Sequence, residues 1–78
     1  RHKRAIGELL ASMETQAEKM GEEDQQVVKE TVTLITQQLA QEVVSDVMLR
    51  ALIANLGPYE LIQDNRKKLA DLLDVPLI

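Results

Sequence analysis

The apolar residues of this chain recur at spacings of three and four, and two points interrupt the rhythm, Gly21 and the pair Gly57-Pro58. Such spacing places side chains on one face of an α-helix, because a helix completes a turn in about 3.6 residues. Glycine readily ends a helix, and proline suits the first turn of the next. The sequence therefore predicts an all-α fold of amphipathic helices.

The first helix is expected over residues 2–20. Its apolar stripe consists of Ile6, Leu9, Leu10, Met13, Ala17 and Met20. Lys19 lies near its end, where a positive charge suits the negative pole of the helix dipole. Gly21 is expected to close this helix in the left-handed conformation that glycine adopts without strain.

The second helix is expected over residues 23–44, with Glu22, Glu23 and Asp24 at its positive end. Its stripe consists of Val28, Val32, Ile35, Leu39 and Val43. The many β-branched residues make a strand the alternative. We favour the helix because the stripe persists for about four turns.

After Val43 the apolar pattern changes phase. When positions are counted around one helix, the apolar residues that follow centre about 110° from the stripe of the second helix. These later residues are Met48, Leu49, Leu52, Ile53 and Leu56. Ser45 and Asp46 lie at this change, and both residue types favour the position that caps a helix start. We therefore favour a break at Ser45-Asp46 and a short helix over residues 46–56. The alternative is one long helix with two apolar faces, one for its own bundle and one for another chain.

The last helix is expected over residues 58–74, ended by Pro76. Its stripe consists of Leu61, Ile62, Leu69, Leu72 and Leu73. Together these segments predict a single domain over residues 1–78, a small helical bundle of three to four helices. Because the chain does not begin with Met, we expect it to be a fragment of a longer one.

The composition suggests a core that gains from a partner. With 78 residues, 45% of them hydrophobic, and Tyr59 as the only aromatic, the core must be aliphatic. A chain this short buries only about 60–65% of the surface that its unfolded form exposes. Without Cys, no disulfide supports the fold and no thiolate holds zinc.

The charge argues against nucleic acid as a partner. The net charge is −4, and an acidic domain repels phosphate. The segment 66–68, Arg-Lys-Lys, could serve a helix-turn-helix, but Asp64, Asp71 and Asp74 dilute it. No signal peptide or membrane span is expected from the pattern, so we expect an intracellular protein.

Catalytic and metal-binding residues are not predicted. His2 is the single His, and it lies in a charged, polar start where a solvated imidazole is the simpler interpretation. Glu14 and Glu18 lie one turn apart, but a carboxylate pair without a nearby His is a weak ligand set. We expect no catalytic residue, no metal and no cofactor.

The candidate binding residues are aliphatic side chains in the second half of the chain. They are Val44, Val47, Met48, Leu49, Leu52, Ile53, Leu56, Leu69, Leu72 and Leu73. The last three form a Leu-x-x-Leu-Leu pattern that can enter an apolar groove, although an ordinary core helix has the same spacing. Asn65 interrupts this stripe and lies either at its edge or in a buried hydrogen bond that fixes a helix register.

These observations predict a non-catalytic protein–protein interaction or oligomerisation module with exposed aliphatic helix faces. Its partner would be another protein or a second copy of itself, because exposed apolar patches mark contact surfaces. The alternative is a regulatory helical domain of a larger enzyme whose catalytic part lies outside this chain.

Overall fold

The computed structural model describes residues 2–77, which form four α-helices and one short 3-10 helix. The α-helices are α1 Lys3–Ala17, α2 Glu22–Leu39, α3 Asp46–Asn55 and α4 Gln63–Leu73, and the 3-10 helix η1 Glu60–Ile62 leads into α4. The predicted all-α bundle is confirmed, with the break before Asp46 and therefore four helices.

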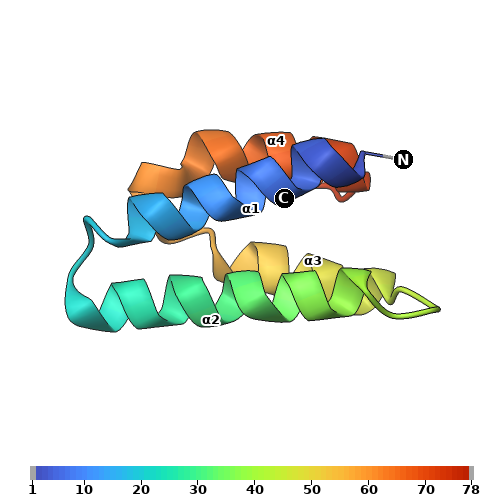
Figure 1. Ribbon diagram of the computed structural model, residues 1–78, viewed down its shortest axis with the longest axis horizontal. Helices are drawn as coiled ribbons and strands as arrows, with labels where there is room; N and C mark the ends of the chain where they lie inside the picture. The colour runs from blue at the N-terminus through green and yellow to red at the C-terminus, as the bar shows by residue number, and fades with distance from the viewer. Residues whose placement is uncertain (1, 78) are drawn as a thin grey trace.

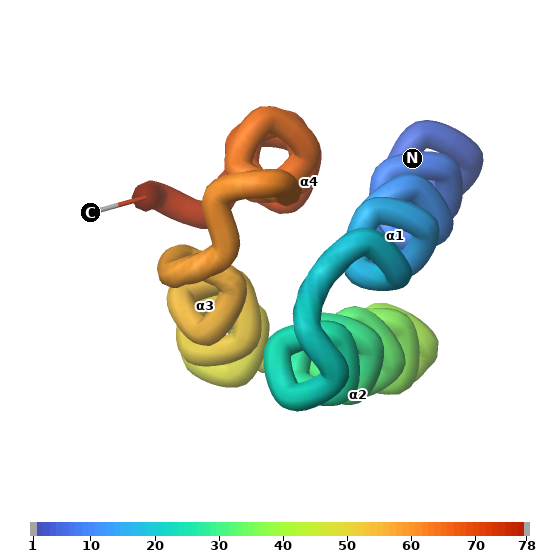
Figure 2. Tube along the Cα trace, turned by 90° about the vertical axis from the view of Figure 1, so that its left-hand side faces the viewer, coloured from blue at the N-terminus to red at the C-terminus, as the bar shows by residue number. Residues whose placement is uncertain are grey.

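The helices form two layers, with α1 and α4 above α2 and α3 (Figure 1). Viewed along the bundle they occupy the corners of a square, and α1 lies beside both α2 and α4 (Figure 2). The first turn of α1 and the α2–α3 connection lie at one end of the bundle, while the α1–α2 turn and η1 lie at the other (Figure 1).

The core is aliphatic, as expected, and every helix contributes to it. Its buried apolar residues are Leu10, Met13, Ala17, Val28, Val32, Ile35, Leu49, Ile53, Leu56, Ile62, Leu69, Ala70 and Val75. Burying a side chain of the size of Ile or Leu stabilises a fold by about 1.5–3 kcal/mol. This closed set is what holds the four helices together.

The break between α2 and α3 is built by Ser45. Its backbone is extended, and its Oγ accepts a 3.1 Å hydrogen bond from the Met48 N–H, as a helix N-cap does. The Ser45 N–H in turn donates to Gln38 Oε1 at 2.8 Å. The Gln38 side chain on α2 and the Ser45 cap of α3 thus fix the end of the connection.

The second helix is shorter than predicted, because α2 ends at Leu39 and not at residue 44. Leu39 already lies level with the first turn of α1, since it lines a shallow groove with His2 and Lys3. A further helical turn would extend beyond α1 with no neighbour to pack against. The prediction that Val43 continues the buried stripe is therefore wrong, and Val43 lies in the connection.

The other helix ends also differ from the prediction. Residues 18–20 form tight turns through i to i−3 bonds, so α1 ends at Ala17. Gly21 is extended, with φ −61° and ψ 158°, and precedes α2; the expected left-handed closure is not found. The last helix begins with η1 at Glu60 rather than at residue 58.

Polar contacts between the helices are few and specific. Asn65 Nδ2 donates to Ser12 Oγ and Gln16 Oε1 on α1, both at 3.0 Å, from a half-buried position. Asn65 thus lies at the edge of the core and also joins α4 to α1, which combines the two interpretations of this residue.

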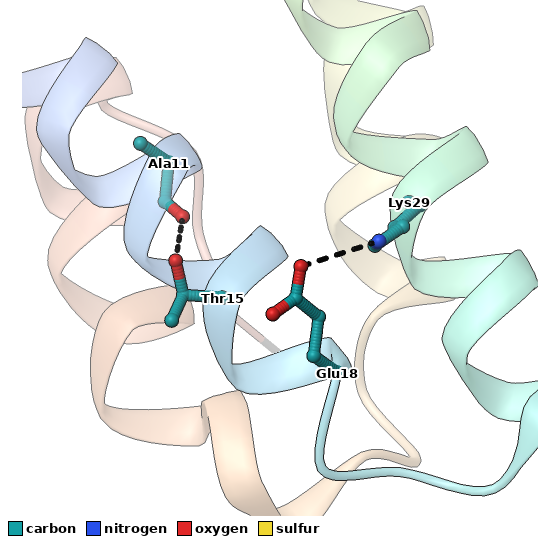
Figure 3. A network of polar contacts seen from close by, with 4 residues as sticks. All are labelled: Ala11, Thr15, Glu18 and Lys29. Atoms are coloured by element: carbon teal, nitrogen blue, oxygen red, sulfur yellow. Dashed lines mark hydrogen bonds and ion pairs between the residues drawn. The ribbon is translucent and has the colours of Figure 1, made fainter.

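At the α1–α2 turn, Lys29 Nζ lies 3.6 Å from Glu18 Oε2, and Thr15 Oγ1 donates to Ala11 O nearby (Figure 3). Both side chains of the ion pair are exposed, so water screens the attraction. This contact adds little to the stability of the bundle.

Candidate functional site: an exposed aliphatic patch at the α2–α3 connection

Every residue from 40 to 48 is exposed, from the end of α2 through the first turn of α3. This segment carries four large aliphatic side chains: Val43, Val44, Val47 and Met48 are 85%, 38%, 79% and 49% exposed. We call these four residues the α2–α3 patch. The connection that carries it projects past the helices at its end of the bundle (Figure 1).

The patch is exposed because α3 buries a different face. The buried residues of α3 and its C-cap, Leu49, Ile53 and Leu56, follow the helical spacing of four and three. Val47 and Met48 come two residues and one residue before Leu49, so their side chains point about 200° and 100° away from it around the helix. The core is complete without them.

The end of the connection is tied to both helices. The Ser45 N–H donates to Gln38 Oε1 on α2, and the Leu49 N–H donates to Ser45 O at 3.0 Å as the first bond of α3. These bonds fix the first turn of α3, where Val47 and Met48 lie. A pre-formed surface binds without the entropy loss of ordering a flexible loop.

The structure divides the predicted contact residues into three groups. Val44, Val47 and Met48 are exposed; Leu52, Leu72 and Leu73 are half-buried; and Leu49, Ile53, Leu56 and Leu69 are buried in the core. The buried four are not part of any outer face. The phase change was a correct sign of the break before α3, whereas the alternative of one long helix with two apolar faces is wrong, and most of the later apolar set lies inside.

Val43 is the exposed patch residue that the sequence reasoning missed. It was assigned to the core stripe because it continues the spacing of Leu39. The signal that could have corrected this is the cap at Ser45, since a residue two positions before an N-cap lies outside both helices.

The leucines of the Leu-x-x-Leu-Leu pattern belong mostly to the core. Leu69 is fully buried, so it cannot enter a groove of another protein while the bundle is folded. Leu72 is half-buried beside the open groove between α1 and α4. The core explanation accounts for this pattern.

Arg66 is used inside the bundle and not on a basic surface. Its Nε donates to Ile53 O at 2.8 Å, and its Nη1 donates to Gln63 Oε1 at 2.9 Å. Gln63 Nε2 in turn donates to Leu56 O and Tyr59 O at 3.0 and 2.7 Å. These side chains add donors to carbonyls at and just after the end of α3, which also accept backbone N–H groups across tight turns.

Gly57 leaves room for this arrangement. A Cβ there would lie 3.1 Å from Ala54 O and 3.3 Å from Arg66 Nη2. A larger residue would push the guanidinium away from the end of α3, so the glycine serves a close approach here and not a left-handed turn.

Charges of both signs surround the α2–α3 patch. Glu42 and Asp46 alternate with its valines and are exposed. Lys3 and Arg4 are exposed on the first turn of α1, at the same end of the bundle (Figure 1). The patch therefore has an aliphatic centre with acidic groups within it and basic groups on the neighbouring helix.

Within residues 2–77, no three His, Asp or Glu side chains gather as a metal ion would require. None of the helices in this range combines the length and apolar character needed to cross a membrane.

Comparisons with known proteins add no relative. The chain matches no family model, no curated protein and no solved structure.

Proposed function

We propose that this domain is a non-catalytic protein–protein interaction module that binds through the α2–α3 patch. The single observation behind this proposal is the run of nine exposed residues, 40–48, that carries four aliphatic side chains beside a core that is already closed. Contiguous exposed apolar surface of this kind marks contact sites in soluble proteins.

The driving force for binding would be burial of these side chains. Each Å² of apolar surface removed from water contributes about 25 cal/mol. Val43 and Val47 retain most of their surface in the free domain, so they offer the largest gain. Met48 adds a flexible side chain that adapts to the shape of a partner.

A site-specific photo-cross-linker tests this proposal. It would replace Met48 in one sample and Leu61 in another, because these residues are almost equally exposed, at 49% and 51%, and lie at opposite ends of the bundle. We expect adducts to form from position 48 in cells and to disappear when Val43→Asp is added. The captured protein would then be purified and titrated against the domain.

Two results would overturn the proposal. One is a set of adducts from position 48 that is no richer than the set from position 61. The other is a purified adduct partner whose affinity is the same for the parent chain and for Val43→Asp.

A further inference from the structure

We infer that the occupant of the α2–α3 patch is a second copy of this chain, in a two-fold symmetric dimer. This inference rests on the proposed interaction function and names its partner. A second copy is the favoured partner because the end of the bundle that carries the patch has both a basic group of residues and an acidic one, which can pair between two copies.

The first half is basic, and its charges lie at a helix start, where the helix dipole disfavours cations. Lys3 and Arg4 occupy the first turn of α1, with no acidic residue in that turn and no side-chain cap. The start of a helix carries partial positive charge, so cations there are unfavourable. A neighbouring carboxylate would remove this penalty, and α1 supplies none in its first turn.

The second half is acidic and lies within the patch. Glu42 stands one residue before Val43, and Asp46 stands one residue before Val47. Both carboxylates are exposed, and neither forms an ion pair among the contacts of residues 2–77. They are free to meet basic groups from outside the domain.

A two-fold axis brings these halves together. In such a dimer the same patch meets itself: residues on the axis meet their own copies, and a contact from residue i to residue j away from the axis is repeated from j to i. Seen from the opposite end, the helices follow one another around the bundle in the order α1, α2, α3 and α4 (Figure 2). The valines on the axis would pack against each other, while Lys3 and Arg4 of each copy would face Glu42 and Asp46 of the other.

The mixed charge also argues against other classes of partner. A polyanion such as nucleic acid or an anionic membrane would be repelled by Glu42 and Asp46. A strongly basic protein would meet Lys3 and Arg4 at the same surface. A copy of the chain satisfies both signs at once, with no like charges left opposite one another.

The size of the dimer interface sets the affinity that we expect between two copies. A standard stable interface buries about 800 Å² on each partner. The chain exposes 5433 Å² in total, so that would be about one seventh of its surface. The residues named for this surface, the four of the patch with Lys3, Arg4, Glu42 and Asp46, are far fewer than the roughly 20–30 residues per side of such an interface, which predicts a weak dimer with a dissociation constant of about 10–100 μM.

Sedimentation equilibrium of the 78-residue chain tests this, across concentrations from about tenfold below to tenfold above that constant. We expect a monomer–dimer equilibrium for the parent chain. Val43→Asp with Val47→Asp should weaken it at least about tenfold, because four buried carboxylates would then face each other across the axis. Leu61→Asp, at the opposite end, should leave it unchanged.

Charge reversal provides the sharper test. One variant carries Lys3→Glu with Arg4→Glu, and the other carries Glu42→Lys with Asp46→Asn, where Asn is tolerated near a helix start. Each alone should dimerise about tenfold more weakly than the parent, since like charges then meet. An equimolar mixture should recover most of the parent affinity, because each remaining charged contact between the two variants is again opposite in sign, while position 46 of one variant is neutral. Circular dichroism checks that all variants remain helical.

The outcomes separate the two proposals. A parent chain that stays monomeric at the highest concentration overturns the dimer, and a different protein captured from position 48 would then leave the interaction function standing. A dimer that survives Val43→Asp with Val47→Asp also overturns the inference, because the interface would lie elsewhere. Failure of the mixed charge variants to recover affinity overturns the two-fold arrangement.

Discussion

The two ends of the bundle contain the same kinds of residue and use them in opposite ways. At the η1 end, Leu56 and Ile62 are fully buried, and Arg66 and Gln63 reach back to the carbonyls of α3. At the α2–α3 end, polar groups satisfy only the connection itself, and the valines face outward. The η1 end stabilises the fold, whereas the α2–α3 end leaves its apolar surface for another molecule.

Loss of a core side chain at the η1 end should have the largest effect on stability. Ile62→Ala removes a fully buried side chain from the junction of η1 and α4, so the free energy of unfolding should fall by about 2–5 kcal/mol. Urea denaturation measures this change. Leu61→Ala, the exposed neighbour, should change it by less than about 0.5 kcal/mol, and equal losses for the two would contradict the burial described here.

Removing the guanidinium at this end should have the next largest effect. Arg66→Met keeps an apolar stem but removes the charged hydrogen bonds to Ile53 O and Gln63 Oε1, which should lower the unfolding free energy by about 1–3 kcal/mol. Lys67→Met is the control, because Lys67 is exposed on the same helix. If Arg66→Met lowers the unfolding free energy no more than Lys67→Met does, water replaces the guanidinium without loss of stability.

The cap at the opposite end should matter somewhat less. Ser45→Ala removes the acceptor of the Met48 N–H and should lower the unfolding free energy by about 1 kcal/mol. Ser45→Asp should retain most of the stability, because Asp is also a good cap. Thermal melts followed by circular dichroism compare the three proteins, and identical melts for the parent and Ser45→Ala would argue against a cap at this position.

The patch itself should contribute least to the stability of the single chain. Val47→Asp at low protein concentration should shift the unfolding free energy by less than about 0.5 kcal/mol, since this side chain is 79% exposed and the new carboxylate lies in the first turn of α3. Leu49→Asp, two residues further, should unfold the domain because Leu49 is buried. If both substitutions unfold the chain, the patch belongs to the core.

Sequence patterns predicted correctly those features of the fold that depend on residues within a single helix. The spacing of Leu10, Met13 and Ala17 needs only the geometry of a helix to indicate a buried face, and these residues are buried. The break before α3 follows from the capping chemistry of Ser45, which acts within its own turn. Such features depend on residues close in sequence.

Features that depend on distant neighbours were not predictable in this way. The end of α2 at Leu39 is set by where α1 begins, on the far side of the bundle. The hydrogen bond from Arg66 to Ile53 O forms only when α3 and α4 are packed together. The sequence alone therefore suggested a basic surface segment at residues 66–68. The choice of which α3 face is buried is likewise a property of the whole bundle.

The position of the first turn of α1 has a practical consequence for any binding measurement. A purification handle, fluorophore or sensor-chip linkage attached ahead of Lys3 would stand at the same end of the bundle as the α2–α3 patch, because α1 starts there (Figure 1). Such a label would shield the surface under study and make a real complex look absent. Attachment near Pro58, which is exposed at the far end, leaves that surface open to solution.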